Sequence, residues 1–182
     1  MEFTSRAGGK LQAALDAFDV DVKNKIVADF GSSTGGFVDC LLQNGAKKVF
    51  SIDTAYGELA WKLRNDERVV VLERTNAMHV ALAEKVDLIT IDTGWTKQSK
   101  IIPNAISNLK KEGKIITLIK PHYEADKKDL TKGKLREEKI DEVLEKVEKD
   151  IAALGLKIKG IIESPIVGGK GGNKEFVALL SL

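Results

Sequence analysis

The chain has 182 residues, a formal net charge of +2 and one cysteine, and 31% of its side chains are charged. This length suits a full hydrophobic core, so we expect a single domain over 1–182. One cysteine excludes an internal disulfide, and no apolar run approaches the roughly 20 residues of a membrane span. We therefore expect a cytoplasmic protein that makes no membrane contact. The small net charge excludes a uniformly basic surface, although lysines concentrate between 120 and 139.

The predicted elements alternate along the chain. Leu11, Ala14, Leu15 and Phe18 share one helical face, which predicts a docking helix at about 8–18. Apolar runs predict seven strands, at 26–30, 47–53, 68–73, 87–92, 113–120, 156–163 and 175–182. Further helices are expected at 37–44, 56–65, 97–111 and 140–154, with a polar, lysine-rich loop from 121 to 135. This order predicts an α/β fold with a mainly parallel seven-stranded sheet, in which the last two strands form an antiparallel hairpin at one edge.

A glycine turn follows the first strand, in the stretch Asp29-Phe-Gly-Ser-Ser-Thr-Gly-Gly-Phe37. Glycine lets the backbone pass close to a ligand where a Cβ atom would block the approach. Asp53 ends the second strand, where nucleotide-binding α/β folds place a carboxylate that accepts hydrogen bonds from ribose hydroxyls. The glycine spacing fits neither G-x-G-x-x-G nor a phosphate-binding loop. These features predict a nucleoside-cofactor site; the alternative is an ordinary tight turn.

Charged residues also end two later strands, Asp92 and Lys120. In an open parallel sheet, ligands bind beyond the carboxyl ends of the strands. An ordinary lysine, with a pKa of about 10.4, is protonated at neutral pH and cannot act as a base. A second cation or partial burial lowers such a pKa, while an aspartate holds the amine in place and opposes the shift. Asp92 and Lys120 are therefore candidates for orienting and deprotonating a hydroxyl group of a substrate.

Motifs over nearly the whole chain carry a specific resemblance. They include Ser5-Arg-Ala-Gly-Gly-Lys10-Leu, the glycine turn after Asp29, Leu118-Ile-Lys-Pro121, Ser164-Pro165 and Gly172-Asn-Lys-Glu-Phe176. Together they resemble the TlyA-type (haemolysin A-like) branch of the FtsJ-like RNA 2′-O-methyltransferase family. The resemblance implies a Rossmann-like class I methyltransferase fold. It also implies S-adenosylmethionine as the cofactor and RNA, above all ribosomal RNA, as the substrate and partner.

The resemblance further implies roles for single residues. The catalytic tetrad is expected to be Lys10, Asp92, Lys120 and Glu175, with Lys120 as the base. The cofactor is expected to contact Gly31, Ser33, Gly35, Gly36 and Phe37 at its methionine end, Asp53 at its ribose, Asn76 near its adenine, and Asp92. The cofactor-binding half is then 25–92 and the catalytic half 93–182. His79 and His122 lack partners at metal-ligand spacing, so no metal site is predicted.

Three departures from the family pattern concern the substrate. Members usually carry an N-terminal S4-like RNA-binding domain, which we expect this chain to lack. Thr93-Gly-Trp-Thr-Lys97 replaces a Ser-Phe-Ile-Ser-like stretch, and Met78 occupies a position that is often arginine. Trp95 has two interpretations, stacking on an RNA base or packing against the sheet. Two alternatives to the enzyme remain open: an inactive module that binds cofactor or RNA, and a nicotinamide-dependent oxidoreductase, which the glycine spacing disfavours.

Overall fold

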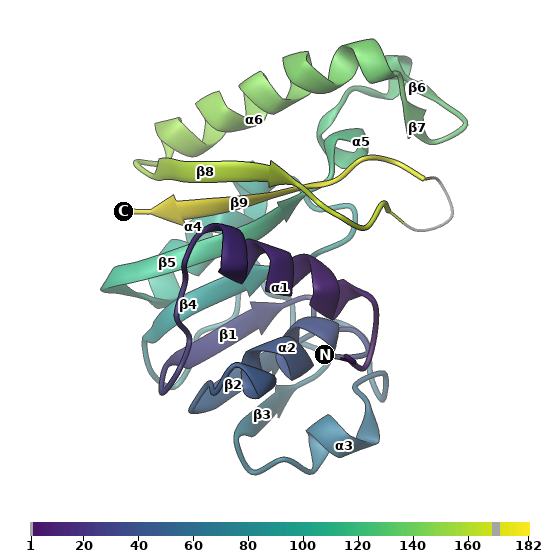
Figure 1. The fold of residues 1–182 in the computed structure, drawn as a ribbon. Helices are drawn as coiled ribbons and strands as arrows, with labels where there is room; N and C mark the ends of the chain where they lie inside the picture. The colour runs from purple at the N-terminus through teal and green to yellow at the C-terminus, as the bar shows by residue number, and fades with distance from the viewer. Residues whose placement is uncertain (1, 169–171) are drawn as a thin grey trace.

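The computed structural model describes residues 2–168 and 172–182. Its main feature is a seven-stranded sheet in the order β3-β2-β1-β4-β5-β9-β8 (Figure 1). β9 runs in the opposite direction to the other six strands and pairs antiparallel with both β5 and β8. The strands are β1 Ile26–Phe30, β2 Lys48–Ile52, β3 Val69–Leu72, β4 Val86–Ile91, β5 Leu109–Ile119, β8 Lys157–Glu163 and β9 Phe176–Ser181. The predicted fold class is confirmed, including the antiparallel pair formed by the last two strands.

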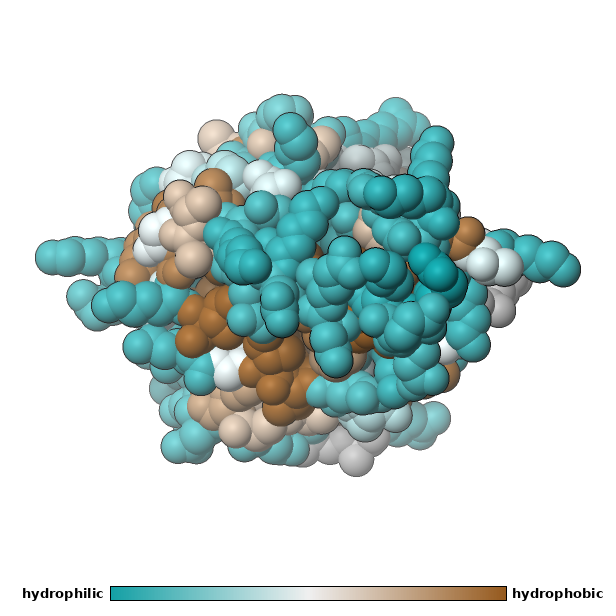
Figure 2. Space-filling model, turned by 90° about the horizontal axis from the view of Figure 1, so that it is seen from above, coloured by the Kyte–Doolittle hydropathy of each residue, from teal (hydrophilic) through white to brown (hydrophobic). Residues whose placement is uncertain are grey.

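Helices cover both faces of this sheet. They are α1 Ala7–Ala17, α2 Gly36–Gln43, α3 Trp61–Arg64, α4 Gln98–Asn108, α5 Pro121–Glu124 and α6 Ile140–Ala153. Alternate residues of each strand point to opposite faces, so Val27 packs with α1 and α2, whereas Ala28 packs with α4 and α6. The α6 side is mostly hydrophilic on its outer surface (Figure 2), because glutamate and lysine occupy the exposed positions of that helix.

Two predicted helices differ from the structure. The helix expected at 56–65 is reduced to Trp61–Arg64. Gly57 has a φ of +77° and donates its N–H to Glu73 Oε1, and the N–H of Ala60 donates to the carbonyl of Thr34. The N–H groups of Gly57 and Ala60 therefore bond to residues outside the segment, and 56–60 forms a turn before the short helix α3.

The helix expected at 97–111 ends at Asn108, because Leu109 pairs with Val86 and begins β5. A register shift in β4–β5 absorbs the extra residues before Lys114. The predicted loop at 121–135 is also more ordered than expected. It contains α5 and a small hairpin of β6 Leu130–Thr131 and β7 Lys134–Leu135.

Candidate active site

The strand register brings the predicted site residues to one edge of the sheet. Phe30 pairs with Ile52 on one side and with Ile91 on the other. The residues that follow these three, Gly31, Asp53 and Asp92, therefore leave adjacent parallel strands side by side. Backbone bonds maintain this arrangement, since the N–H groups of Gly31 and Ser32 both donate to the carbonyl of Ile52.

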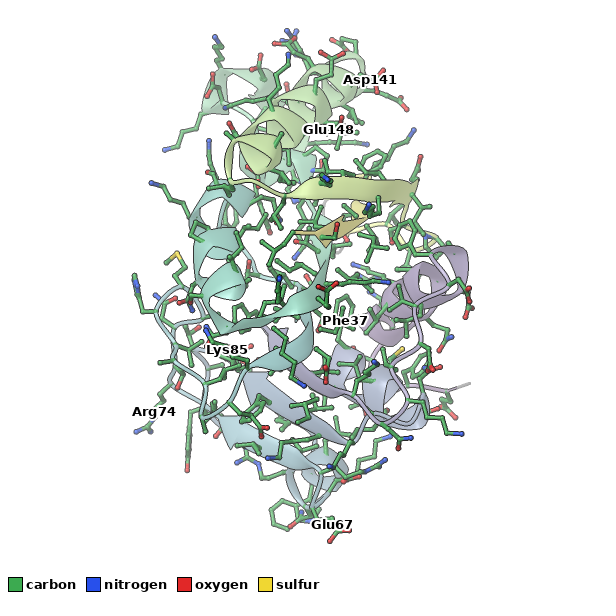
Figure 3. The ribbon with its side chains drawn as sticks, turned by 90° about the vertical axis from the view of Figure 1, so that its left-hand side faces the viewer. Phe37, Glu67, Arg74, Lys85, Asp141 and Glu148 are labelled. Carbon is green, nitrogen blue, oxygen red and sulfur yellow. The ribbon has the colours of Figure 1, made fainter. Side chains whose placement is uncertain are left out.

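A groove of two adjoining hollows lies over these strand ends. The smaller has a volume of about 270 Å³ and the larger about 630 Å³, and both are lined by Gly31, Ser33 and Asp92. The smaller hollow also reaches Gly36 and Phe37, as expected for one end of the cofactor. Phe37 is nevertheless only 3% exposed and lies mainly inside the molecule (Figure 3).

The larger hollow contains the residues predicted to bind the nucleoside. Asp53 Oδ2 accepts a hydrogen bond of 2.7 Å from the Ser33 N–H, and Oδ1 accepts one of 2.8 Å from the Ala55 N–H. A carboxylate can accept about four hydrogen bonds, so both oxygens keep capacity for hydroxyl donors. Asn76 is exposed and lines the same hollow. Its Oδ1 accepts the N–H of Met78, which fixes the side chain.

Two glycines of the turn are required by neighbouring protein atoms. Gly31 has a φ of +92°, and a Cβ atom there would lie 2.6 Å from the carbonyl oxygen of Asp92. A Cβ atom on Gly36 would lie 2.3 Å from Ser5 Oγ, so this glycine lets the N-terminal segment dock on α2. Gly35, with a φ of +95°, lines neither hollow; a Cβ atom there would lie 2.3 Å from Leu63 Cδ1, so neighbouring protein atoms constrain this position as well. Clearing space for a ligand, which the sequence predicts for these glycines, is thus at most part of their role.

The four predicted catalytic residues form two ion pairs. Lys120 Nζ lies 2.6 Å from Asp92 Oδ1, and Lys10 Nζ lies 2.5 Å from Glu175 Oε2. The first pair lines the smaller hollow, whereas the side chains of the second pair are 7% and 5% exposed. Ile119 pairs with Phe176 in β5–β9, which places Lys120 opposite Glu175 at the end of the two antiparallel strands. The structure thus brings the two pairs to neighbouring positions.

Asp29 is a further acidic group of the site, and it is completely buried. Its Oδ1 accepts a hydrogen bond of 2.7 Å from Thr90 Oγ1, but Oδ2 has no partner among the described residues. Burial raises the pKa of Asp29 to about 7, and the charges of Asp92 and Asp53 act in the same direction. The middle of β1 therefore holds a carboxyl group that titrates near neutral pH.

A separate cavity of about 410 Å³ begins at Pro121 and His122, the residues directly after Lys120. Its walls include His122 from α5, Lys134 and Arg136 from the β6–β7 region, and Lys174 before β9. Asn173 attaches these segments to one another, since its Oδ1 accepts the N–H of Leu135 and its Nδ2 donates to the carbonyl of Gly133. This cavity was not predicted from the sequence, where 121–135 was a plain loop.

Glu124 is a further buried acidic residue; Glu124-Ala125 is one of the stretches that resemble the family, but the resemblance assigned no role to this carboxyl group. It is 4% exposed, and its Oε1 accepts the N–H of Gln98 at 2.8 Å, which joins α5 to the start of α4. Burial raises the pKa of this carboxyl group. No pattern in a segment rich in charged residues distinguishes one glutamate that turns inward.

Clusters of metal ligands and membrane-spanning helices are both absent from the described ranges 2–168 and 172–182. Within them no group of three or more His, Cys, Asp or Glu side chains is placed to hold a metal ion. No helix there is both long enough and apolar enough to cross a bilayer.

The strand order and the groove define a Rossmann-like methyltransferase fold. The solved structure of an S-adenosylmethionine-dependent methyltransferase from Mesorhizobium loti shares this fold, with a TM-score of 0.67 and 13% identity over 94% of this chain and 97% of that one. The family model of FtsJ-like methyltransferases matches residues 3–181, and the chain belongs to this family.

Closer relatives support the TlyA-type branch. The Bacillus subtilis protein YqxC is 43% identical over 97% of this chain and 65% of its own length. The 16S/23S rRNA (cytidine-2′-O)-methyltransferase TlyA of Mycobacterium tuberculosis is 36% identical over 97% of this chain and 68% of that protein. A solved hemolysin-group structure from Streptococcus thermophilus has a TM-score of 0.95 at 37% identity, covering 99% of this chain and 67% of that one. The chain thus spans about two thirds of the length of these relatives.

Proposed function

We propose that this chain is the methyltransferase unit of an enzyme that transfers a methyl group from S-adenosylmethionine to a ribose 2′-hydroxyl of RNA, above all ribosomal RNA. The observation that carries this proposal is the Lys120–Asp92 ion pair of 2.6 Å, which lines the smaller hollow of the groove. The cavity begins at the next residue, Pro121. The M. tuberculosis relative is named for the same chemistry on cytidine. In this proposal 25–92 binds the cofactor and 93–182 binds the substrate and carries Lys120.

The charges of the groove favour this cofactor over a nicotinamide dinucleotide. The residues lining the two hollows include three carboxylates, Asp53, Glu58 and Asp92, and one cation, Lys120, which is paired with Asp92. A pyrophosphate needs positive groups or a suitable glycine-rich helix start, and the spacing provides no such start. S-adenosylmethionine supplies a methyl group on a cationic sulfonium, and it carries a ribose and no phosphate. Asp53 is available to its ribose hydroxyls, and Gly31, Ser33 and Asp92 line both parts of the groove.

The chemistry assigned to the tetrad is proton removal and charge stabilisation. S-adenosylmethionine, when bound, would supply the methyl group, and its C–S bond would break to leave a neutral thioether. Lys120 Nζ, in its uncharged form, would accept the proton of the 2′-hydroxyl. Asp92 holds Nζ in position and stabilises the ammonium group that forms. Lys10 and Glu175 neutralise each other in a buried pair beside Lys120, which fixes the end of β9 against α1. The carbonyl of Thr93 accepts a further hydrogen bond of 3.2 Å from Lys120 Nζ, which restricts the amine to one direction.

The cationic cavity is the proposed path of the RNA backbone. Lys134 makes no ion pair within the described part of the chain. Arg136 pairs with the half-buried Asp129 and the exposed Glu138, and Lys174 pairs with the exposed Glu137. Phosphate groups can compete for such cations, because they carry a full charge and several acceptor oxygens. The cavity begins at Pro121 and His122, directly after Lys120. RNA bound there would present a ribose near the proposed base.

The test is transfer of labelled methyl from S-adenosylmethionine to ribosomal RNA and to ribosomal subunits, with Lys120→Ala beside the wild type. Loss of a positioned base lowers such rates about 100- to 10,000-fold, so we expect a drop in that range with little change in cofactor affinity. Lys114→Ala, an exposed lysine on the same strand, is the matched control and should retain full activity. Full activity of Lys120→Ala would disprove the assigned base. Cofactor binding without transfer to any RNA would favour an inactive binding module.

A further inference from the structure

The contact between Lys120 and Asp92 is not set by the pairing of the strands that carry them. Ile91 pairs with Thr117, and this is the last pair between β4 and β5. Asp92 follows Ile91 directly, whereas Lys120 lies three residues beyond Thr117. Both residues lead into segments outside the sheet, the loop 93–97 after β4 and α5 after β5. The 2.6 Å contact between the two side chains therefore depends on what holds these segments.

Gln98, the first residue of α4, holds the end of the loop that follows β4. Its Oε1 accepts a hydrogen bond of 2.6 Å from Thr117 Oγ1, and its Nε2 donates one of 3.2 Å to the carbonyl of Leu118. Gln98 and Thr117 are both buried. Trp95 does not anchor this loop, because it is 84% exposed, and the interpretation that it packs against the sheet is wrong. Gln98 thus fixes the loop to β5, two residues before Lys120.

Glu124, the last residue of α5, holds the segment that follows Lys120. Its Oε1 accepts the backbone N–H of Gln98 at 2.8 Å, and its own carbonyl accepts a hydrogen bond of 3.3 Å from Lys97 Nζ. Two consecutive residues at the start of α4 are therefore bonded to one residue of α5. Glu124 is 4% exposed, and a buried carboxylate is costly to leave without a donor. The turn is short, since the Tyr123 N–H donates to the carbonyl of Lys120 itself.

We propose that Gln98 and Glu124 are positioning residues for the proposed base, which together set the distance between Lys120 Nζ and Asp92. This inference rests on the proposed function and adds to it the residues by which the protein holds its base. Neither residue lines the groove or the cavity, so neither is placed to touch a ligand. They act through the ion pair, because they bond the segments that follow its two members to each other and to β5.

Kinetics of methyl transfer to ribosomal subunits test this role. A displacement of about 1 Å in a reacting group lowers a rate about 100-fold, so Glu124→Ala and Gln98→Ala should each lower kcat about 10- to 100-fold. The KM for RNA and the Kd for S-adenosylmethionine should stay near those of the wild type. Glu124→Gln keeps an oxygen that accepts the Gln98 N–H, and it should restore most of kcat. A loss that appears in the two affinities instead of in kcat would overturn the proposal.

Asn108→Ala is the matched control. Asn108 is 5% exposed and ends the same helix α4. Its Oδ1 accepts the N–H of Leu82, and its Nδ2 donates to the carbonyl of Val80, so its removal also breaks buried hydrogen bonds to a neighbouring segment. It lines neither hollow of the groove, and its variant should keep the wild-type kcat. If Asn108→Ala loses as much kcat as Gln98→Ala, the loss reflects the stability of α4, and the proposal is wrong.

A second measurement asks whether the two residues act through Lys120. Residues that act through one group have non-additive effects, so Glu124→Ala should lower the residual rate of Lys120→Ala no further. A further loss of about 10-fold in that background would contradict the positioning role. Gln98→Ala carries the same test from the other side if Glu124→Ala does not fold. If the wild type transfers no methyl, the proposed function fails; if it does and both alanine variants keep its kcat, only the positioning role fails.

Discussion

The two sides of Lys120 differ in charge and in construction. The groove on one side presents carboxylates, and it is built from the ends of parallel strands whose register is set by the sheet. The cavity on the other side is lined by three cations, Lys134, Arg136 and Lys174, and by one carboxylate, Glu137, which pairs with Lys174. It is built from a short hairpin and loop segments joined by Asn173. The ion pair of Lys120 and Asp92 lies between them.

This difference separates the two ligands by charge. A cationic cofactor is favoured on the acidic side, and a polyanion is favoured on the basic side and repelled from the groove. Under the proposed function, the two ligands would meet at the Lys120–Asp92 pair. The comparison also predicts that substitutions on one side change the binding of one ligand and leave the other nearly unaffected.

The largest expected effect is on the free energy of unfolding, and it concerns Asp29, two residues before Gly31 of the groove. Because the pKa of Asp29 is raised from 3.8 to about 7 by burial, the unfolded chain loses this proton at a lower pH than the folded chain. The stabilising contribution is complete below about pH 4 and is lost as pH rises to 7. At about 1.4 kcal/mol per pH unit, the cost to folding grows by about 4 kcal/mol between pH 4 and 8.

Asp29→Asn removes this titration. Its free energy of unfolding, measured by urea denaturation across pH 4–8, should therefore rise relative to the wild type by about 4 kcal/mol as pH increases. The buried amide adds a constant offset, so the slope of the difference is the quantity to measure. If the free energy of unfolding depends on pH in the same way for the wild type and for Asp29→Asn, the raised pKa of Asp29 is contradicted.

The second effect concerns ligand binding on the same side. Asp53→Ala removes a charged acceptor, and hydrogen bonds to charged groups are worth about 1.5–3 kcal/mol. We expect the Kd for S-adenosylmethionine, measured by calorimetry, to rise about 10- to 100-fold, with the KM for RNA nearly unchanged. Glu84→Ala, which removes a carboxylate outside the groove, should match the wild type. An equal loss of affinity for both ligands would contradict the separation of the two sides.

The groove can be predicted from the sequence to a larger extent than the cavity. Alternating apolar runs identify the strands, and charged residues at their ends place Asp53, Asp92 and Lys120 at one edge, because parallel strands share that edge. Lys10 and Glu175 are 165 residues apart, and only the family resemblance pairs them. The cavity depends on side-chain contacts such as those of Asn173 and Glu124, which follow no periodic pattern. Asp29 opens the glycine motif in the sequence, and its place within the apolar strand Ile26–Phe30 already indicates a buried carboxyl group.

The smallest expected effect concerns the basic side. Each cation that contacts a phosphate adds about one to the slope of log affinity against log salt concentration. Lys134→Ala and Arg136→Ala should each lower that slope for ribosomal RNA by about one, with S-adenosylmethionine affinity unchanged. Lys149→Ala is the control, because Lys149 lies in the second half of α6 and its side chain is 79% exposed; this variant should leave the slope unchanged. If the three variants behave alike, the RNA does not pass through this cavity, and the RNA-binding surface lies elsewhere on the protein.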